Sequence, residues 1–170
     1  MKLVRGAKSG NVKAQDKSLE GKTERKNLAA GISDGNLLLM KQNFLEPHGL
    51  KVTVDRVLYQ PNVETPPDLP HCFVYFISIH NETPLPVTIH ARKWVVTNSR
   101  GEVTAVEGDG VVGEHPNIEP GEKFSYNSFH LLDTMSAVAE GSYIGVDGLG
   151  RKVLTRIPKF KMRVPEKEEE

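Results

Sequence analysis

Large apolar side chains recur at every second position in the part of the chain that follows residue 50. The clearest run is Phe73, Tyr75, Ile77 and Ile79. A period of two over this length is typical of a β-strand that buries one face. The pattern therefore predicts a half-buried strand here.

Segments with similar patterns are separated by turn signals rich in proline, glycine and asparagine. Strands are predicted from Leu50, over 87–97, 103–106, 124–129, 141–146 and 153–164. Turns are predicted at Asn81–Pro84, Asn98–Gly101, Pro120–Glu122 and Asp147–Gly150, and 61–70 is too rich in proline for regular structure. Turn signals at intervals of roughly 10–15 residues predict an all-β sandwich of about seven to eight antiparallel strands.

Two of the predicted strands break the period of two. Val87 and Ile89 have odd numbers, whereas Trp94 and Val96 have even ones, so a regular strand cannot place all four on one face. We expect a β-bulge or a twist near Arg92-Lys93.

The last strand has the same break, between Ile157 and Phe160, with Pro158 inside it. Proline cannot donate a hydrogen bond to a neighbouring strand, so we expect this strand to lie at a sheet edge or to be bulged there. We expect Trp94 to lie in the core, because a single tryptophan in a central sandwich strand usually does.

Composition divides the chain into three parts. We expect residues 1–45 to form a flexible basic arm with a short helix over 36–45, residues 46–165 to form the sandwich, and residues 166–170 to be an acidic tail. The basic side chains of the arm are Lys2, Arg5, Lys8, Lys13, Lys17, Lys22, Arg25 and Lys26.

The overall charge and the cysteine content exclude several classes of protein. The formal net charge is +0, so no global field favours nucleic acid or an anionic membrane, and we expect neither as a partner. Cys72 is the single cysteine, which argues against a disulfide-stapled secreted domain. Without an apolar run of membrane-spanning length, cytoplasm is the expected location.

Three glycines give the chain its most conspicuous motif. Gly108, Gly110 and Gly113 have the spacing G-x-G-x-x-G, which in dinucleotide-binding enzymes precedes a helix whose N-terminus holds the pyrophosphate. Here Pro116 and Pro120 follow, so no helix is expected, and the helix that a dinucleotide fold requires after the glycines is missing.

Two interpretations of this glycine loop remain. Backbone amides of Gly108–Gly113 could hold a phosphate, with charge supplied by Arg92, Lys93 or Lys123. Alternatively, the glycines only permit a tight crossover, with Val111 and Val112 in the core. We favour the second interpretation, because the conformational freedom of glycine alone explains the spacing.

The residues that could carry catalysis form no convincing constellation. Ser128 and His130 would share one face of a strand, but such pairs are common and no G-x-S-x-G elbow is present. We therefore predict that the chain is not an enzyme.

The histidines have no metal-ligand spacing. His80 and His90 could face each other across a hairpin, and Asp109, Glu114 and His115 could offer ligands near the loop, but a closed site needs three or four converging groups. We expect no metal site and no cofactor.

A set of motifs in order along the chain resembles the ApaG domain family over about residues 50–165. The matching motifs are Asn81, Arg92-Lys93-Trp94, Gly108–Pro116, Pro120-Gly121, Phe124-Ser125-Tyr126, Gly141-Ser142-Tyr143 and Ile157-Pro158-Lys159-Phe160. The chain departs from the family pattern at Lys93, His115, Asn127, Phe129 and Ala137.

This resemblance implies an immunoglobulin-like or fibronectin-III-like sandwich and no established catalytic activity. It also implies an interaction module, a link by name to cobalt and magnesium efflux, and a suggested affinity for pyrophosphate or nucleotides. We therefore predict a non-enzymatic binding or adaptor domain with a protein partner. The alternative is a phosphate, pyrophosphate or nucleotide binder that uses Gly108–Gly113. An exposed sheet edge could also support a homodimer.

Overall fold

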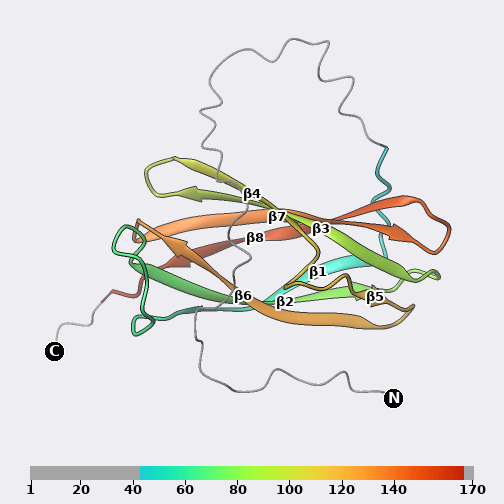
Figure 1. Ribbon diagram of the computed structural model, residues 1–170, viewed down its shortest axis with the longest axis horizontal. Coiled ribbons are helices and arrows are strands. Elements are labelled where there is room, and N and C mark those ends of the chain that lie inside the picture. The colour runs from blue at the N-terminus through green and yellow to red at the C-terminus, as the bar shows by residue number, and fades with distance from the viewer. Residues whose placement is uncertain (1–42, 167–170) are drawn as a thin grey trace, which may run out of the picture.

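The computed structural model describes residues 43–166, and every described element is a β-strand (Figure 1). In chain order the strands are β1 Leu50–Tyr59, β2 His71–Asn81, β3 Val87–Asn98, β4 Val103–Asp109, β5 Asn117–Ile118, β6 Lys123–Leu132, β7 Ser136–Asp147 and β8 Lys152–Arg163. Most of the predicted basic arm and of the acidic tail lies outside the described residues. Residues 43–166 contain no helix long and apolar enough to cross a membrane.

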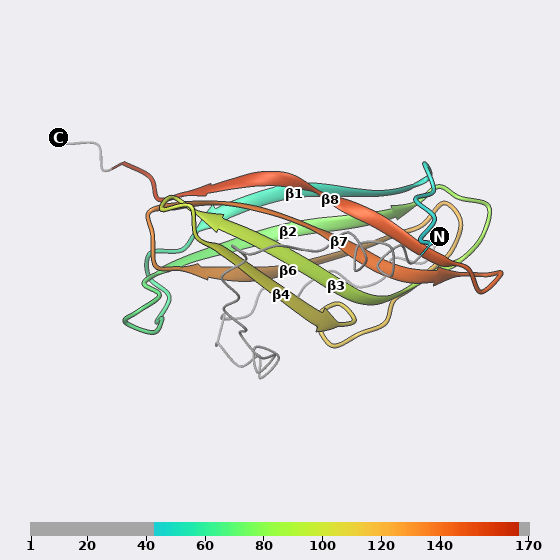
Figure 2. The ribbon, with the colours of Figure 1, turned by 90° about the horizontal axis from the view of Figure 1, so that it is seen from above.

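The strands form two antiparallel sheets that pack face to face. One sheet has the order β1-β2-β6, and the other has the order β4-β3-β7-β8 with β5 also paired to β3. The two layers are separate in Figure 1, and Figure 2 shows β1 and β8 together at one margin and β4 at the opposite side. The predicted all-β sandwich is confirmed.

The core lies between the two sheets and is built from the alternating positions. Phe73, Tyr75, Ile77 and Ile79 of β2 are all buried, as the period of two predicts. Trp94 of β3 is also buried and packs on Tyr75, with ring centroids 5.1 Å apart. The prediction that Trp94 belongs to the core is confirmed.

The irregularity in β3 exists but lies two residues before its predicted position. The register with β7 shifts between Ile89 and Ala91, so the extra residue is His90 rather than Arg92 or Lys93. After the bulge the even-numbered residues face the interior, and Arg92 lies opposite the fully buried Tyr143. The bulge therefore directs a charged side chain toward the inside of the sandwich.

Strand β8 is an edge strand and is also irregular at its proline, as predicted. Its register with β7 shifts between the pairs Ala139–Phe160 and Gly141–Ile157, a stretch that contains Pro158. Residues on both sides of the shift, Ile157 and Met162, are buried. The irregularity explains how positions of opposite parity reach one core.

The chain passes from one sheet to the other between β2 and β3. His80 and His90 consequently belong to different sheets, and the expectation that they face each other across a hairpin is wrong. His80 lies opposite Lys51 and Lys123, whereas the ring of His90 lies 5.5 Å from that of His115.

The described chain begins beside β8. The amide of Leu45 donates to the carbonyl oxygen of Lys152 at 3.0 Å, and the carbonyl oxygen of Leu45 accepts from the amide of Leu154 at 2.8 Å. Of the helix predicted over 36–45, only the last three residues are described, and there Leu45 forms a parallel bridge with Val153. The sandwich thus includes the last residue assigned to the arm.

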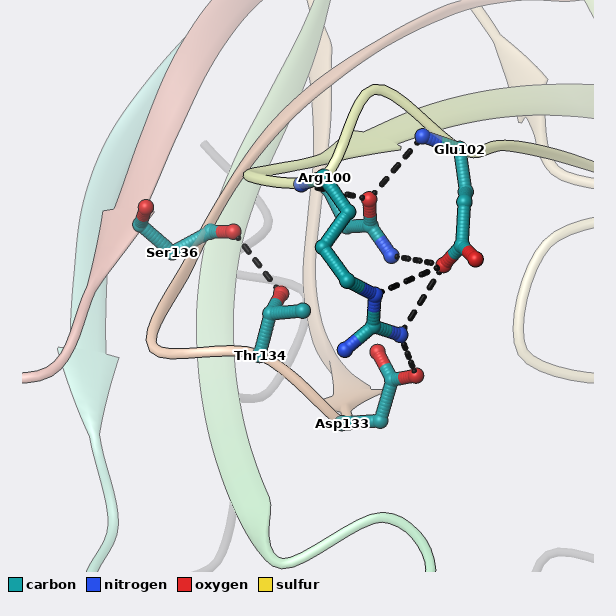
Figure 3. Close-up of polar contacts among 6 residues, drawn as sticks. Arg100, Glu102, Asp133, Thr134 and Ser136 are labelled. Atoms are coloured by element: carbon teal, nitrogen blue, oxygen red, sulfur yellow. Dashed lines mark hydrogen bonds and ion pairs between the residues drawn. The ribbon is translucent and has the colours of Figure 1, made fainter.

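A polar cluster closes the turn between β3 and β4 (Figure 3). The side-chain oxygen of Asn98 accepts hydrogen bonds from the amides of Arg100 and Glu102, each at 3.0 Å. The guanidinium of Arg100 forms ion pairs with Glu102 and with Asp133, which lies in the β6–β7 turn. This cluster, Asn98, Arg100, Glu102 and Asp133, joins a turn of one sheet to the turn that connects the two sheets.

Candidate functional site

The glycine loop forms a tight turn at the other end of β4. Val111 and Glu114 exchange two backbone hydrogen bonds, of 2.8 and 3.0 Å, around Val112 and Gly113. Both central residues have positive φ, 50° for Val112 and 76° for Gly113. Two consecutive positive φ angles within a two-residue connection define a type I′ turn.

The two valines of this turn have different environments. Val111 is fully buried and belongs to the core, whereas the side chain of Val112 projects into solvent and the residue is 44% exposed. The expectation that both valines lie in the core is therefore confirmed for Val111 and wrong for Val112. A β-branched residue with φ near +50° is strained, and type I′ turns normally place asparagine, aspartate or glycine there.

Gly110 is required by close packing and by its conformation. Its φ is +59°, and a Cβ atom at this position would overlap the carbonyl oxygen of Glu114 and lie 2.7 Å from Cδ2 of His115. Its amide donates to the carbonyl oxygen of the bulged His90 at 2.6 Å. The loop is thus fixed to β3 at the bulge.

Arg92 holds the same loop from the interior side. Its Nη1 donates to the carbonyl oxygens of Asp109 and Gly110, at 3.0 and 2.9 Å. A Cβ atom on Gly108 would lie 2.6 Å from the guanidinium carbon, so this glycine makes room for Arg92. The guanidinium therefore contacts backbone oxygens, which carry partial negative charge, and stabilises the loop.

Arg92 also lies near buried tyrosines. Burial raises the pKa of Tyr75 to about 12, an effect that a hydrogen bond with Ser128 and the charge of Arg92 partly offset. Burial likewise raises the pKa of Tyr126 and Tyr143, whose hydroxyl groups are hydrogen-bonded to each other. All three phenols are neutral at physiological pH.

The other two predicted basic residues lie elsewhere. The Nζ of Lys93, on the outer face of β3, is 3.4 Å from Oε1 of Glu107. Lys123 lies on β6 in the opposite sheet, in register with His80. The structure thus brings Arg92 to Gly108–Gly113, leaves Lys93 on the outer face beside β4, and does not bring Lys123 to the loop.

Few loop amides remain for an anion. The amides of Gly110, Val111 and Glu114 already donate to backbone oxygens, and within residues 43–166 those of Val112 and Gly113 have no hydrogen-bond partner. Asp109 adds negative charge beside the loop, where its Oδ2 lies 3.1 Å from Nε2 of His115. The described residues contain no group of three His, Cys, Asp or Glu side chains arranged to hold a metal ion.

The Ser128 and His130 pair does not form a nucleophile and base. His130 packs between Tyr75 and Trp94, with ring centroids 4.9 Å from each. Its Nε2 and the Nε1 of Trp94 are buried without a hydrogen-bond partner among the described residues. Burial lowers the pKa of His130 to about 4, so the ring is neutral at physiological pH.

A polar network on the outer face of β1-β2-β6 was not anticipated. The carboxylate of Asp55 accepts hydrogen bonds from Thr53 at 2.7 Å and from Ser78 at 2.6 Å, and Ser78 also contacts Ser125. Burial acts to raise the pKa of Asp55, but these hydrogen bonds and the charges of Lys123 and His80 outweigh it and lower the pKa. Polar residues at alternate positions of β1 were the available sequence signal.

Comparisons with known proteins agree on one family. A family model for the ApaG domain matches residues 61–147. Protein ApaG of Enterobacter sp. (strain 638) is 37% identical over 108 residues, which are 64% of this chain and 86% of the relative. Protein ApaG of Vibrio cholerae serotype O1 (strain M66-2) is 39% identical over 93 residues, 55% of this chain and 74% of the relative.

A solved structure supports the same result. The crystal structure of the putative ApaA protein from Bordetella pertussis superimposes with a TM-score of 0.64 at 31% sequence identity. The superposition covers 71% of this chain and 98% of that protein.

Proposed function

Because the chain belongs to the ApaG domain family, we propose that it is a non-enzymatic, cytoplasmic binding or adaptor domain that recognises a protein partner. The observation that carries the proposal is the turn at Val112. This apolar side chain is exposed at the tip of a loop whose base is fixed by Val111, Arg92 and the His90 bulge.

The strain at Val112 supports a role in recognition. A β-branched residue in the left-handed region costs about 1–3 kcal/mol, and asparagine would fit the same turn at lower cost. Strain that surrounding contacts maintain is found most often at binding and switch regions. An exposed valine on a rigid base gives a partner an apolar contact that requires little ordering on binding.

The experiment is affinity capture from native extract with the full chain, the Val112→Asn variant and a matched control. The control is Leu149→Asn, which removes an apolar side chain that is 68% exposed in the β7–β8 turn. We expect Val112→Asn to lose the partner and Leu149→Asn to keep it. Equal capture by all three proteins, or no saturable partner at all, would contradict the proposal.

Phosphate binding at the loop is a second candidate, favoured by the two unpartnered amides of Val112 and Gly113. The test is a titration with pyrophosphate followed by amide NMR. Binding at this site would shift the Val112 and Gly113 resonances first and leave Lys123 unchanged. If neither resonance moves at millimolar pyrophosphate, this candidate is wrong.

The link to cobalt and magnesium efflux stays a prediction from the family resemblance. We propose that such a link would act through the protein partner, because the described residues gather no three side chains suited to a metal ion. Equilibrium dialysis against cobalt tests this, and stoichiometric binding by the purified chain would contradict it.

A further inference from the structure

We propose that the free edge of β4 binds an extended segment of a partner protein as an added strand. The bound segment would place arginine or lysine side chains against Glu107 and Asp109. This inference rests on the proposed role as a protein-binding domain and adds the partner's conformation and charge.

Strand β4 differs from an ordinary edge strand in its exposure. Val103, Thr104 and Ala105 are exposed in succession, so both faces of the strand reach solvent at this end, and Val103 alone is 59% exposed. The other unpaired edge at this side of the sandwich, β6, instead alternates between exposed and partly buried residues over its first half. Figure 1 shows β4 at the margin of its sheet, raised from the second layer.

The backbone of β4 offers hydrogen-bonding groups that no described strand uses. The amide of Gly110 donates to His90, and the carbonyl oxygen of Glu102 accepts from Asn98, so even-numbered residues direct these groups toward β3. Because the direction alternates along an antiparallel strand, the N–H and C=O groups of Ala105 and Glu107 point away from the sheet. These are the groups that an added strand pairs with.

The outer face beside this edge has room and charge for particular side chains. A shallow depression of about 380 Å³ is lined by Ala91, Arg92, Lys93, Glu107, Gly108, Asp109 and Ile144. Ala91 and Ile144 supply apolar surface for the aliphatic part of a long side chain. Glu107 and Asp109, whose side chains are 74% and 86% exposed, supply carboxylates for its charged end.

The charges of the site favour a basic occupant over an acidic one. Both basic residues of the lining already have partners: Lys93 pairs with Glu107 at 3.4 Å, and Arg92 donates to the carbonyl oxygens of Asp109 and Gly110. Asp109 has His115 as its ion-pair partner, which is charged only when protonated. Strand addition supplies affinity through the backbone, and the depression supplies a preference for arginine or lysine.

The probe is a blocked heptapeptide in which valine and arginine alternate, and its binding to the full chain is measured by fluorescence anisotropy. The test variant is Ala105→Pro, which removes one outward N–H group and no hydrogen bond to β3. The matched control is Asn127→Pro on β6. The carbonyl oxygen of Glu122 accepts a hydrogen bond from the amide of Asn81, so even-numbered residues of β6 direct their backbone groups toward β2. The N–H group of Asn127, an odd-numbered residue, therefore points away from the sheet, as that of Ala105 does.

We expect Ala105→Pro to weaken peptide binding about tenfold and Asn127→Pro to leave it unchanged. The proline at position 105 removes one backbone hydrogen bond to the peptide and misaligns the adjacent ones, and together these losses account for about a factor of ten in affinity. A peptide with glutamate in place of arginine should not bind, and Glu107→Gln together with Asp109→Asn should reduce this preference.

Equal effects of the two prolines, or equal binding of the arginine and glutamate peptides, would overturn the inference. So would a dimer of the chain alone that Ala105→Pro dissociates, since a second copy would then be the occupant. Native-extract capture that is lost with Val112→Asn but unchanged with Ala105→Pro would overturn the strand addition and leave the proposed function standing.

Discussion

The turns at the two ends of β4 both contain residues with positive φ, but they place different residue types there. At the Asn98 end, glycine occupies the position with positive φ, Gly101 at 82°, and the side chain of Asn98 pairs the nearby amides. At the loop end, Val112 takes a positive φ beside Gly113, and the amides of both residues lack partners within residues 43–166.

This difference distinguishes a turn whose residues suit its backbone from a turn that keeps a strained residue. The Asn98 turn uses residues suited to its backbone, as expected of a structural connection. The loop end accepts a strained and exposed valine although a better turn residue exists, and proteins generally accept such costs at sites of function. The contrast supports the proposal that the loop end is the site of recognition.

The largest expected effect comes from adding one methyl group at each end. Gly110→Ala should lower the free energy of unfolding by about 3–4 kcal/mol, because the new Cβ overlaps the Glu114 carbonyl oxygen at a positive φ. Gly101→Ala should cost only about 1 kcal/mol, because its Cβ would meet nothing within 4 Å. Urea unfolding measures both, and equal losses would show that the loop end yields as easily as the other.

The next effect depends on pH and arises from His130, which packs between Tyr75 and Trp94. His130 lies three residues before Asp133, and burial lowers its pKa to about 4. Since the unfolded chain binds this proton near pH 6.5, stability should be complete above pH 6.5 and fall by about 3 kcal/mol as the pH drops to 4.

Unfolding by urea at several pH values tests this prediction. His130→Leu should remove most of the fall, whereas Gly110→Ala should keep it while being less stable throughout. A fall of the same size in His130→Leu would assign the acid sensitivity to other groups.

A smaller effect of opposite sign is expected at the strained turn. Val112→Asn should raise the free energy of unfolding by about 1 kcal/mol, because asparagine adopts positive φ at lower cost. Val111→Asn is the matched change at the fully buried neighbour and should strongly destabilise the protein. Thermal unfolding measures both, and a destabilising Val112→Asn would show that the valine contributes more packing than strain.

The smallest effect is expected from the ion pairs in Figure 3, whose side chains are largely exposed. Arg100→Ala should lower the Tm by about 2 °C or less in low salt, and not at all in about 1 M salt. Hydrogen bonding to Arg100 lowers the pKa of Asp133, so this contribution is present above the ordinary carboxyl pKa and lost at lower pH. A large effect that persists in high salt would mean that the cluster holds the two turns together.

Alternation along the chain was sufficient to predict the sandwich and its strands apart from the two-residue β5, because a period of two is a local property of a half-buried strand. The break in parity also required an irregularity somewhere between Ile89 and Trp94. Its place at His90 depends on the amide of Gly110, which is distant in sequence. The sequence alone could not locate it.

The candidate site was harder to predict for the same reason. Arg92 has the parity of Trp94, which was a usable sign that it points inward, but its contacts with the loop carbonyls arise only in three dimensions. Val111 and Val112 are chemically identical, and only the backbone turn separates a core residue from an exposed one. The placement of His80 and His90 failed because a short connection can join two sheets as readily as two paired strands.

The two margins of the larger sheet also limit how many molecules can join in one assembly. Strand β8, at the margin opposite β4, contains Pro158 beside a register shift, and its start is paired with Leu45. Within residues 43–166, the margin opposite the proposed β4 site is therefore an irregular edge whose start is already paired, and it is less suited to a further strand addition. If a partner strand adds at β4 as proposed, we therefore expect complexes of fixed stoichiometry and no growth into fibres, because polymerisation requires two receptive ends.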